Sequence, residues 1–181
     1  MPTSLSLSLR KKFQRVKLLL CDVDGVLTDG RIYVDEDGRE LKAYSSLDGF
    51  AMKMLQSSGI VVAWITGSRS AAVARRATNL GIGHVVQGVE DKYPAWQALR
   101  EGLSIASEDC AHIGDDLPDL PLILRCGLGA TVPHAPELLR RRAHYVTRAD
   151  GGRGAVREIA ELLLAARGAL DDVVRAFEVA P

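Results

Sequence analysis

The sequence predicts an α/β fold in which a doubly wound parallel sheet carries helices on both faces. Short apolar runs without a helical period recur along the chain, and segments with a helical pattern alternate with them. Such runs are typical of strands that are buried on both faces of a parallel sheet. Several runs end in acids or glycine, and the alternation predicts one doubly wound domain for a chain of 181 residues.

The predicted strands begin with residues 17–22, where the apolar run Leu18–Cys21 stops at Asp22. The second strand covers 60–65, another apolar run, which stops at Thr66. Short runs of this kind suit strands better than helices. The remaining strands are expected at 84–86, 110–113, 128–131 and 144–147.

The predicted helices are 48–58, 70–80, 93–102, 118–125, 135–141 and 154–166. We expect the domain to span 13–168, after a poorly ordered leader at 1–12 and before a C-terminal tail at 169–181. Residues 169–177 are an alternative extension of the last helix, which Gly168 disfavours.

One insertion interrupts the alternation after the first strand. Arg31–Val34 and Glu40–Tyr44 flank the turn residues 35–38, Asp-Glu-Asp-Gly. This arrangement predicts a β-hairpin, which would form a flap directly after the first acidic motif.

The first acidic motif is Asp22-x-Asp24, followed by Gly25. In an extended chain residues i and i+2 point to the same side, so both acids face the crevice where open α/β sheets bind ligands. Clustered carboxylates repel one another unless a cation lies among them, and oxygen ligands favour Mg²⁺. The alternative is a polar turn after a core strand, since Asp and Gly are common in turns.

Three further motifs follow later strands. Thr66-Gly67-Ser68 offers a hydroxyl and backbone N–H groups to a phosphoryl oxygen, and Lys92 offers a charge that neutralises phosphate. Gly114-Asp115-Asp116 supplies a third carboxylate for a cation. Each has a structural alternative when taken singly, as a helix cap or a solvated side chain. Together, at strand ends, they favour a phosphoryl-transfer site.

With this quartet the chain resembles the haloacid dehalogenase superfamily, and specifically its magnesium-dependent phosphatases. Order and spacing match over roughly residues 16–165. The resemblance implies a Rossmann-like haloacid dehalogenase fold. Dehalogenase members lack the acid at the position of Asp24, because they protonate no alcohol leaving group. Asp24 therefore favours phosphate ester chemistry.

The resemblance and the needs of the reaction assign catalytic roles. Asp22 is expected to be the nucleophile that forms an aspartyl phosphate. Asp24 is expected to protonate the departing alkoxide and then to accept a proton from the attacking water. Thr66 and Lys92 are expected to hold the transferring phosphoryl oxygens.

The same resemblance implies a Mg²⁺ site. The ligands are expected to be the Asp22 carboxylate, the Asp24 backbone carbonyl, Asp115 and water. Asp116 and Asp119 are expected to lie behind the site and support it, although helix capping accounts for Asp119 equally well.

The chain between the motifs is too short for a cap domain in addition to the hairpin. An uncapped site is open to water and selects little by shape, so it needs a bulky substrate or a neighbouring subunit. An exposed hairpin edge also invites pairing with another chain. The capless members that the chain resembles are tetramers, so we expect a homotetramer.

Within the superfamily, the chain is similar to the capless family that hydrolyses 3-deoxy-D-manno-octulosonate 8-phosphate in lipopolysaccharide precursor synthesis. The matching segments are Cys21–Gly30, Lys42–Tyr44, Asp48–Phe50, Asn79–Ile82, Gly114–Asp119 and Tyr145–Glu158. The resemblance implies a sugar phosphate substrate and a C-terminal glycine-rich segment near an active site of the assembly. Gly151-Gly152 would give this segment the mobility of a lid, and Arg153 would bind an anion. The alternative is a flexible lead into the last helix.

Substrate contacts are carried over by position, with Ser45–Gly49 as the substrate loop. The expected contacts are Asp24, Ser45, Ser46, Leu47, Asp48, Gly49, Lys53, Gly67, Ser68, Arg69, Arg76, Lys92 and Arg153. Leu47 and Lys53 stand where some members carry arginine, and Ser45 replaces an asparagine. Arg69 is taken as the substitute for a basic residue that the family often has at Ser68. Solvated surface positions are the alternative for Lys53 and Arg76.

Two other functions remain open. One is hydrolysis of a nine-carbon sialic-type sugar phosphate, against which the neutral Ser68 and Arg153 argue. The other is a catalytically silent oligomerisation module, which should have lost an acid that this chain retains.

Composition excludes other function classes. The net charge is zero and no broad basic stripe is present, so we expect no nucleic-acid partner. No apolar run is long enough to span a bilayer, and the N-terminus lacks the order of a signal peptide. Cys21, Cys110 and Cys126 show no metal or redox spacing, which is typical of reduced core residues in a cytoplasmic protein.

Overall fold

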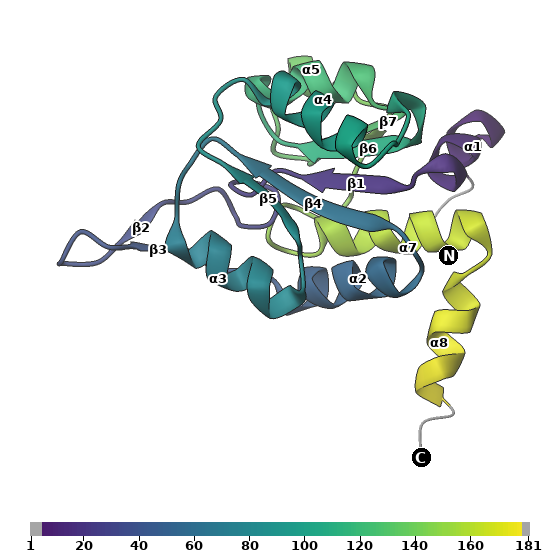
Figure 1. The fold of residues 1–181 in the computed structure, drawn as a ribbon, viewed down its shortest axis with the longest axis horizontal. Helices are drawn as coiled ribbons and strands as arrows, with labels where there is room; N and C mark the ends of the chain where they lie inside the picture. Colours follow the sequence, from purple (N-terminus) through teal and green to yellow (C-terminus); the bar gives the residue numbers. More distant parts are fainter. Residues whose placement is uncertain (1–4, 179–181) are drawn as a thin grey trace.

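A six-stranded parallel sheet forms the centre of the computed structural model, which describes residues 5–178 (Figure 1). Its strands are β1 (Leu18–Cys21), β4 (Val61–Thr66), β5 (His84–Gln87), β6 (Cys110–Gly114), β7 (Leu128–Thr131) and β8 (Tyr145–Val146). They lie in the order β5-β4-β1-β6-β7-β8, and every neighbouring pair is parallel. The predicted doubly wound fold is confirmed, with strand bounds within two residues of the prediction.

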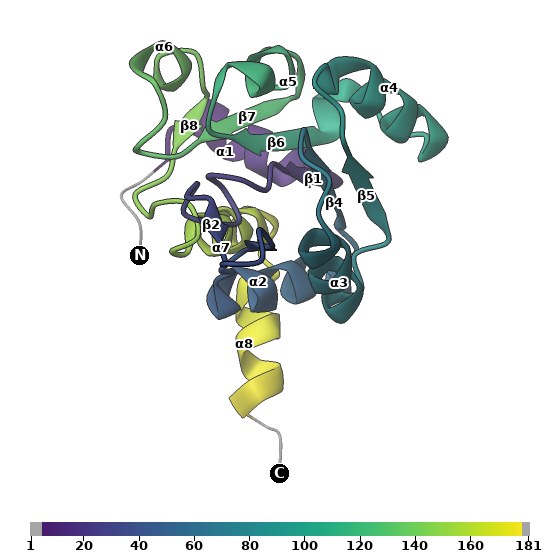
Figure 2. The ribbon, with the colours of Figure 1, turned by 90° about the vertical axis from the view of Figure 1, so that its left-hand side faces the viewer.

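Helices cover both faces of this sheet, as Figures 1 and 2 show. One face carries α4 (Lys92–Gly102), α5 (Leu120–Arg125) and α6 (Glu137–Arg140). The other carries α2 (Ser46–Ser57), α3 (Ala71–Leu80) and α7 (Ala155–Arg167). Short 3₁₀ turns at Ser107–Asp109 and Leu117–Asp119 complete the connections. All six predicted helices are confirmed.

The central strand β1 explains why its sequence is a continuous apolar run. All four of its residues are buried. Leu19 and Cys21 belong to the core beneath α2 and α7, whereas Leu18 and Leu20 pack with Trp96 on the opposite face. Because side chains alternate between the faces of a strand, a sheet covered on both sides needs apolar residues at every position.

The expectation of a poorly ordered leader is wrong for residues 7–12, which belong to helix α1 (Leu7–Arg15). Ser6 caps this helix by accepting a hydrogen bond from the Leu9 amide, and Lys12 Nζ donates to the Gly127 carbonyl at 2.9 Å. Leu9 and Phe13 lie one turn apart and pack against the core, which fixes the helix. The part of the leader at 1–4 lies outside the described residues.

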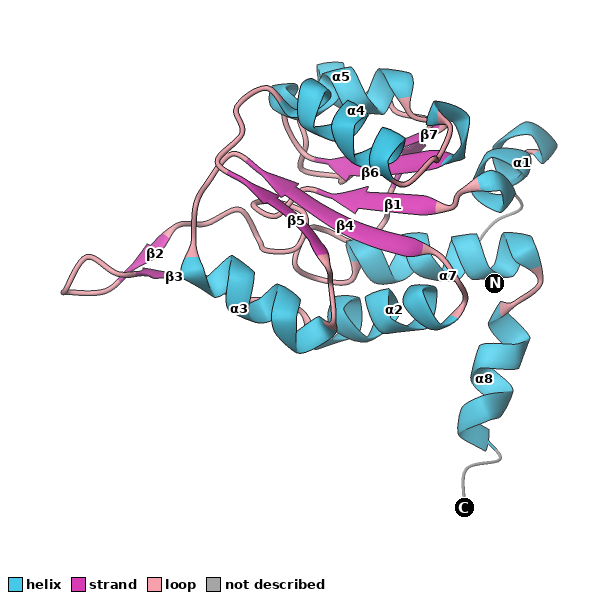
Figure 3. Ribbon diagram, viewed as in Figure 1, coloured by secondary structure: helices cyan, strands magenta, loops and turns pink. Residues whose placement is uncertain are grey.

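The C-terminal tail forms a separate helix, α8 (Leu170–Glu178), rather than an extension of α7. Gly168 ends α7 with φ 72°, the left-handed conformation in which glycine stops helices. Helix α8 then leaves the body of the molecule at a steep angle (Figure 3).

The predicted hairpin is confirmed as β2 (Tyr33–Val34) paired antiparallel with β3 (Glu40–Leu41). It projects outward from the body of the molecule (Figure 1), and between β1 and α2 no other insertion is present. Within residues 5–178, no helix combines the length and apolarity needed to cross a membrane.

Truncating the buried ring of α1 tests whether this helix belongs to the folded domain. Phe13 is fully buried and meets the Tyr145 ring edge-on at 5.6 Å. Phe13→Ala is expected to lower the free energy of unfolding in urea by about 3–5 kcal/mol, because it leaves a cavity. Leu7→Ala, at an exposed position of the same helix, should change it by less than about 0.5 kcal/mol. Equal small effects would mean that α1 is not docked.

Candidate active site

The carboxyl ends of β1, β4 and β6 meet at one edge of the sheet, since β1 lies between the other two. A cavity of about 530 Å³ opens there, a size suited to a small ligand. Its lining residues are Asp22, Asp24, Thr66, Gly67, Ser68, Val89, Glu90, Lys92, Asp115, Asp116, Pro118 and Asp119. The structure therefore brings together all four motifs that the sequence singled out.

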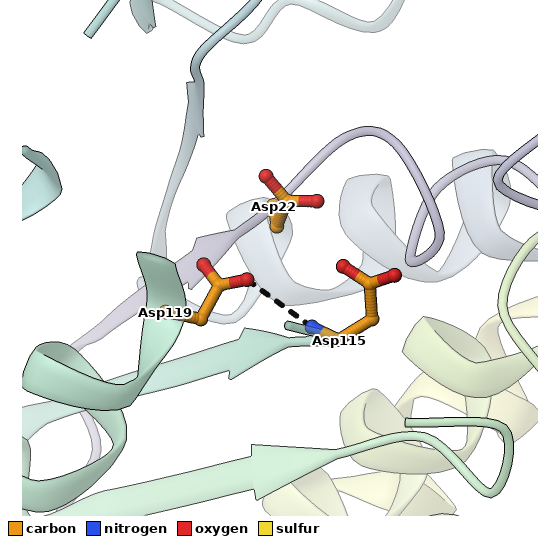
Figure 4. A group of neighbouring side chains, drawn as sticks. All are labelled: Asp22, Asp115 and Asp119. Atoms are coloured by element: carbon orange, nitrogen blue, oxygen red, sulfur yellow. Dashed lines mark hydrogen bonds between the residues drawn. The ribbon is translucent and has the colours of Figure 1, made fainter. Parts of the chain in front are cut away.

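Three carboxylates form the centre of this cavity (Figure 4). Oxygen atoms of Asp22, Asp115 and Asp119 lie within 4.8 Å of one another. Burial and the charge of Asp119 raise the pKa of Asp22 well above its usual range, although Lys92 opposes this. Burial and the same neighbouring charge raise the pKa of Asp115 to about 6. Crowded carboxylate oxygens that resist ionisation are the donor set that a divalent cation such as Mg²⁺ stabilises.

Asp119 organises its neighbours and has little capacity left for a cation. Its Oδ1 accepts from Lys92 Nζ at 2.7 Å and lies 2.8 Å from His112 Nε2. Its Oδ2 accepts from the backbone amides of Asp115 and Asp116. Burial acts against ionisation, but the hydrogen bond with His112 and the charge of Lys92 lower the pKa of Asp119 to about 2. Asp119 therefore holds Lys92 and the Asp115–Asp116 turn in place, and it also closes this turn as a cap.

Lys92 begins α4 and is almost fully buried. Its ammonium also donates to Asp22 Oδ1, so it bridges Asp22 and Asp119. Burial alone would lower the pKa of Lys92, but the two carboxylates outweigh it and raise the pKa. The lysine is therefore a cation fixed beside the candidate nucleophile.

His112 was not identified by sequence reasoning. It lies on β6 within an apolar run and is completely buried, so nothing in the local pattern separates it from a packing residue. Burial lowers its pKa, although the hydrogen bond with Asp119 opposes this. The spacing of seven residues to Asp119, across a strand end, was the available signal.

Asp24 is held by two side chains. Its Oδ1 accepts from Lys42 Nζ at 2.5 Å, and its Oδ2 accepts from Ser68 Oγ at 2.8 Å. Thr66 Oγ1 lies 3.1 Å from Ser68 Oγ, and it accepts a hydrogen bond from the Ser68 amide, which fixes the turn between the two residues. Burial lowers the pKa of Lys42, but hydrogen bonds with Asp24 and Glu40 outweigh it and raise the pKa.

Glycine is required where the acidic motifs approach each other. Gly25 has φ 94°, and a Cβ there would lie 1.9 Å from Asp115 Oδ2. The Thr28 hydroxyl accepts from the Gly25 and Gly30 amides, so the loop after β1 is locked around this contact. Gly25, which forms the turn of the first motif, therefore also leaves space for the Asp115 carboxylate of the fourth motif.

The expectation that Gly151-Gly152 forms a mobile lid is wrong. The Gly152 amide donates to the Val26 carbonyl at 2.9 Å, and a Cβ at Gly151 would lie 1.7 Å from the Gly25 carbonyl oxygen. Glycine is needed here because two backbones touch. Arg153 is exposed in a separate cavity of about 220 Å³ with Asp29, Arg31, His134, Asp150 and Gly151.

The expected substrate contacts divide into two groups. Asp24, Gly67, Ser68 and Lys92 line the cavity. The others do not line it: Ser45, Ser46, Leu47, Asp48, Gly49, Lys53, Arg69, Arg76 and Arg153. Lys53 instead lines a groove of about 610 Å³ between α2 and α8, beside Phe50 and Phe177.

Asp48 is the clearest correction among these contacts. It is 1% exposed, and its carboxylate accepts from the Gly154 and Arg157 amides at 3.1 and 2.8 Å. Asp48 therefore caps the start of α7 instead of facing a substrate. Burial raises its pKa, which these amide donors partly offset. Gly49 leaves space for the Arg76 guanidinium, since a Cβ there would lie 2.4 Å from Arg76 Nη2.

The comparisons with known proteins agree with this geometry. Residues 78–159 match a family of haloacid dehalogenase-like hydrolases. The 3-deoxy-D-manno-octulosonate 8-phosphate phosphatase of Escherichia coli K12 is 48% identical over 161 residues, which cover 89% of this chain and 86% of that protein.

Two solved structures are similar along nearly the whole chain. The phosphatase of the same name from Moraxella catarrhalis, in complex with magnesium, phosphate and KDO, has a TM-score of 0.93 and 43% identity, covering 96% of this chain and 99% of that one. The cobalt-bound deoxy-D-mannose-octulosonate 8-phosphate phosphatase of Haemophilus influenzae has a TM-score of 0.88 and 35% identity, covering 92% and 99%. The chain belongs to the 3-deoxy-D-manno-octulosonate 8-phosphate phosphatases, within the haloacid dehalogenase-like hydrolases.

Proposed function

We propose that this protein hydrolyses 3-deoxy-D-manno-octulosonate 8-phosphate to the free sugar acid and phosphate, with Mg²⁺ as cofactor. The observation that carries the proposal is the convergence of Asp22, Asp24, Thr66 and Lys92 on one cavity beside a cluster of crowded carboxylates. Family membership, and the magnesium and KDO named for the Moraxella catarrhalis structure, support the substrate and the metal.

The first step transfers the phosphoryl group to Asp22. A carboxylate oxygen of Asp22 attacks phosphorus, and the bond from phosphorus to the sugar oxygen breaks. Lys92, which already bonds Asp22, offsets the charge of the phosphoryl oxygens, and the Thr66 hydroxyl donates to one of them. Asp22, Asp115 and the Asp24 backbone carbonyl would hold Mg²⁺, which when bound supplies further positive charge against the phosphoryl group.

Asp24 donates a proton in the first step and accepts one in the second. A sugar alkoxide is a poor leaving group, so the Asp24 carboxyl donates a proton to it as the bond breaks. The resulting carboxylate then takes a proton from the water that attacks the aspartyl phosphate. Phosphate leaves, Asp22 is regenerated, and Asp24 is again protonated.

Replacing the nucleophile tests the proposed chemistry. Asp22→Asn is expected to lower the rate of phosphate release by a factor on the order of 10⁴ or more, because an amide cannot form the acyl phosphate. The assay compares the eight-carbon and nine-carbon 2-keto acid phosphates and an aryl phosphate, each with Mg²⁺ and with a chelator. Circular dichroism establishes that the variant is folded.

Each outcome of this assay separates the candidate functions. Preference for the eight-carbon substrate supports the proposal, and preference for the nine-carbon acid would replace the substrate. An active Asp22→Asn enzyme would remove the covalent intermediate. Absence of release from every ester would leave a silent oligomerisation module.

The raised pKa of Asp115 gives Mg²⁺ binding a pH dependence. Its ordinary value of 3.8 rises to about 6 in the folded chain, so its contribution to stability is present below pH 3.8 and is lost as the pH rises through about 6. Mg²⁺ competes with the proton for the same oxygens. The increase in melting temperature caused by Mg²⁺ should therefore be larger at about pH 7.5 than at about pH 5.

The control for this measurement is Asp115→Asn, in which Mg²⁺ should raise the melting temperature little at either pH. An equal Mg²⁺ effect on the unsubstituted protein at both pH values would contradict the assignment of Asp115 as a ligand.

We further propose a homotetramer in which the hairpin mediates contacts between subunits and the segment around Arg153 lies near an active site of the assembly. The support is that the hairpin exposes Ile32, Val34 and Leu41, which is unusual for a small antiparallel unit in water. A cytoplasmic location is proposed because Cys21, Cys110 and Cys126 are free and buried, which suits a reducing compartment.

Charging the hairpin tests the assembly. Ile32→Lys with Val34→Lys is expected to convert the tetramer into smaller species in light scattering, because like charges would meet at the proposed contact. Leu124→Lys, an equally drastic change on an exposed position of α5, should leave the mass unchanged. A mass unaffected by the hairpin variant would place the subunit contacts elsewhere.

A further inference from the structure

The charge of Lys42 lies where burial makes an unpaired charge costly. It follows β3 at the base of the hairpin, and its side chain is only 4% exposed. Its ammonium bonds Asp24 Oδ1 and Glu40 Oε1, each at 2.5 Å. Lysine is among the residues least often buried, and it is tolerated when carboxylates replace its water. The hairpin is thus tied to the sheet through the Asp24 side chain.

The two oxygens of Asp24 have different environments. Oδ1 faces Lys42, which has donors and no acceptor, so this oxygen serves only as an acceptor there. Oδ2 faces Ser68, whose hydroxyl both donates and accepts, and Ser68 continues to Thr66 in the cavity wall. Oδ2 is therefore the oxygen of Asp24 whose partner can both donate and accept, and it lies on the side of Thr66 and Ser68.

We propose that Lys42 is a positioning residue for the reaction: by holding Oδ1 it fixes the Asp24 carboxyl so that Oδ2 exchanges its proton with the ester oxygen. This inference rests on the proposed function, because it requires Asp24 to be the general acid. It assigns the base of the hairpin a task in catalysis. Displacing the hairpin would displace the acid.

The chemistry of the leaving group separates positioning of the acid from all other roles. The leaving group of a sugar or simple alkyl phosphate is an alkoxide, which needs the proton. The leaving group of dinitrophenyl phosphate is a stable phenolate, which does not need it. A residue that acts through Asp24 therefore affects alkyl esters selectively in the first step, whereas the second step, in which Asp24 takes a proton from water, is common to all esters. A residue that merely stabilises the fold affects both esters alike.

The experiment measures kcat/KM, which reports phosphoryl transfer to Asp22 and not the later hydrolysis of the aspartyl phosphate, for the sugar substrate, an alkyl phosphate and dinitrophenyl phosphate at saturating Mg²⁺. Lys42→Met should lower kcat/KM for the first two by about 10- to 100-fold, and for dinitrophenyl phosphate by less than about threefold. Lys42→Arg keeps a donor and should recover most of the loss. Asp24→Asn defines the full selectivity that loss of the acid produces.

Arg39→Met is the matched control, since it removes a cation from the same hairpin whose guanidinium bonds Asp35 and Asp37. It should leave the ratio of kcat/KM for the alkyl phosphate to kcat/KM for dinitrophenyl phosphate unchanged. If Lys42→Met does not fold, the double variant Glu40→Gln with Lys42→Met, which removes Lys42 together with one of its two carboxylate partners, is measured in its place.

The outcomes distinguish this inference from the function on which it rests. A selective loss in Asp24→Asn and in Lys42→Met supports it. A selective loss in Asp24→Asn alone, or an equal loss for both esters in Lys42→Met, overturns the role of Lys42 and leaves the proposed phosphatase intact. An unselective Asp24→Asn overturns the general acid and, with it, the role of Lys42.

Discussion

The buried ion pair of Lys92 with Asp22 and Asp119 is the interaction on which the rest of the site depends. None of the three residues is more than 5% exposed. Without the ammonium, the two carboxylates would face each other and Asp115 where water screens little of their repulsion. Removing one partner from such a group costs more than the pair contributes, because the remaining charge is left buried. The surrounding chain is accordingly arranged to keep these groups in place.

Backbone packing achieves much of this arrangement. Gly114 leaves space for the Asp119 side chain, Gly25 for Asp115, and Gly151 for the Gly25 carbonyl. A side chain at any of these positions would push apart elements that carry the carboxylates. The glycines of the acidic motifs and of the C-terminal segment therefore all allow close packing around the site, although Gly25 and Gly151 are more than a hundred residues apart in sequence.

The sequence was sufficient to predict the sheet and the residues at its strand ends. A short apolar run shows where a buried strand stops, and the residues directly after it share the crevice with those of its neighbours. Asp22, Thr66 and Asp115 were predictable for this reason. Lys92 was singled out for its charge after a predicted strand, and the resemblance to a known family added the assignment of roles, which no local pattern could supply.

Contacts between distant segments could not be predicted in the same way. Lys42 reaches Asp24 from the hairpin, and Asp48 reaches amides 106 and 109 residues later. The periodicity of apolar residues predicts which face of a helix or strand is buried. It does not predict which distant segment packs against that face. Leu9 and Phe13 have the four-residue spacing of a helix face, but the basic residues between them made this apolar pattern difficult to recognise.

Substitutions in the exposed hairpin and at the buried strand ends have different structural consequences. Nearly every catalytic group sits on a strand end, where a substitution damages fold and chemistry together. A Cβ at Gly38, at the hairpin tip, would meet no atom within 4 Å, so the tip has space for changes in length and sequence that leave the exposed apolar residues Ile32, Val34 and Leu41 in place. We expect lineages with this fold to acquire new sugar preferences by altering the tip, while the base of the hairpin, with its one buried lysine, stays unchanged. The reach of the flap is then a trait that selection adjusts independently of the ester chemistry.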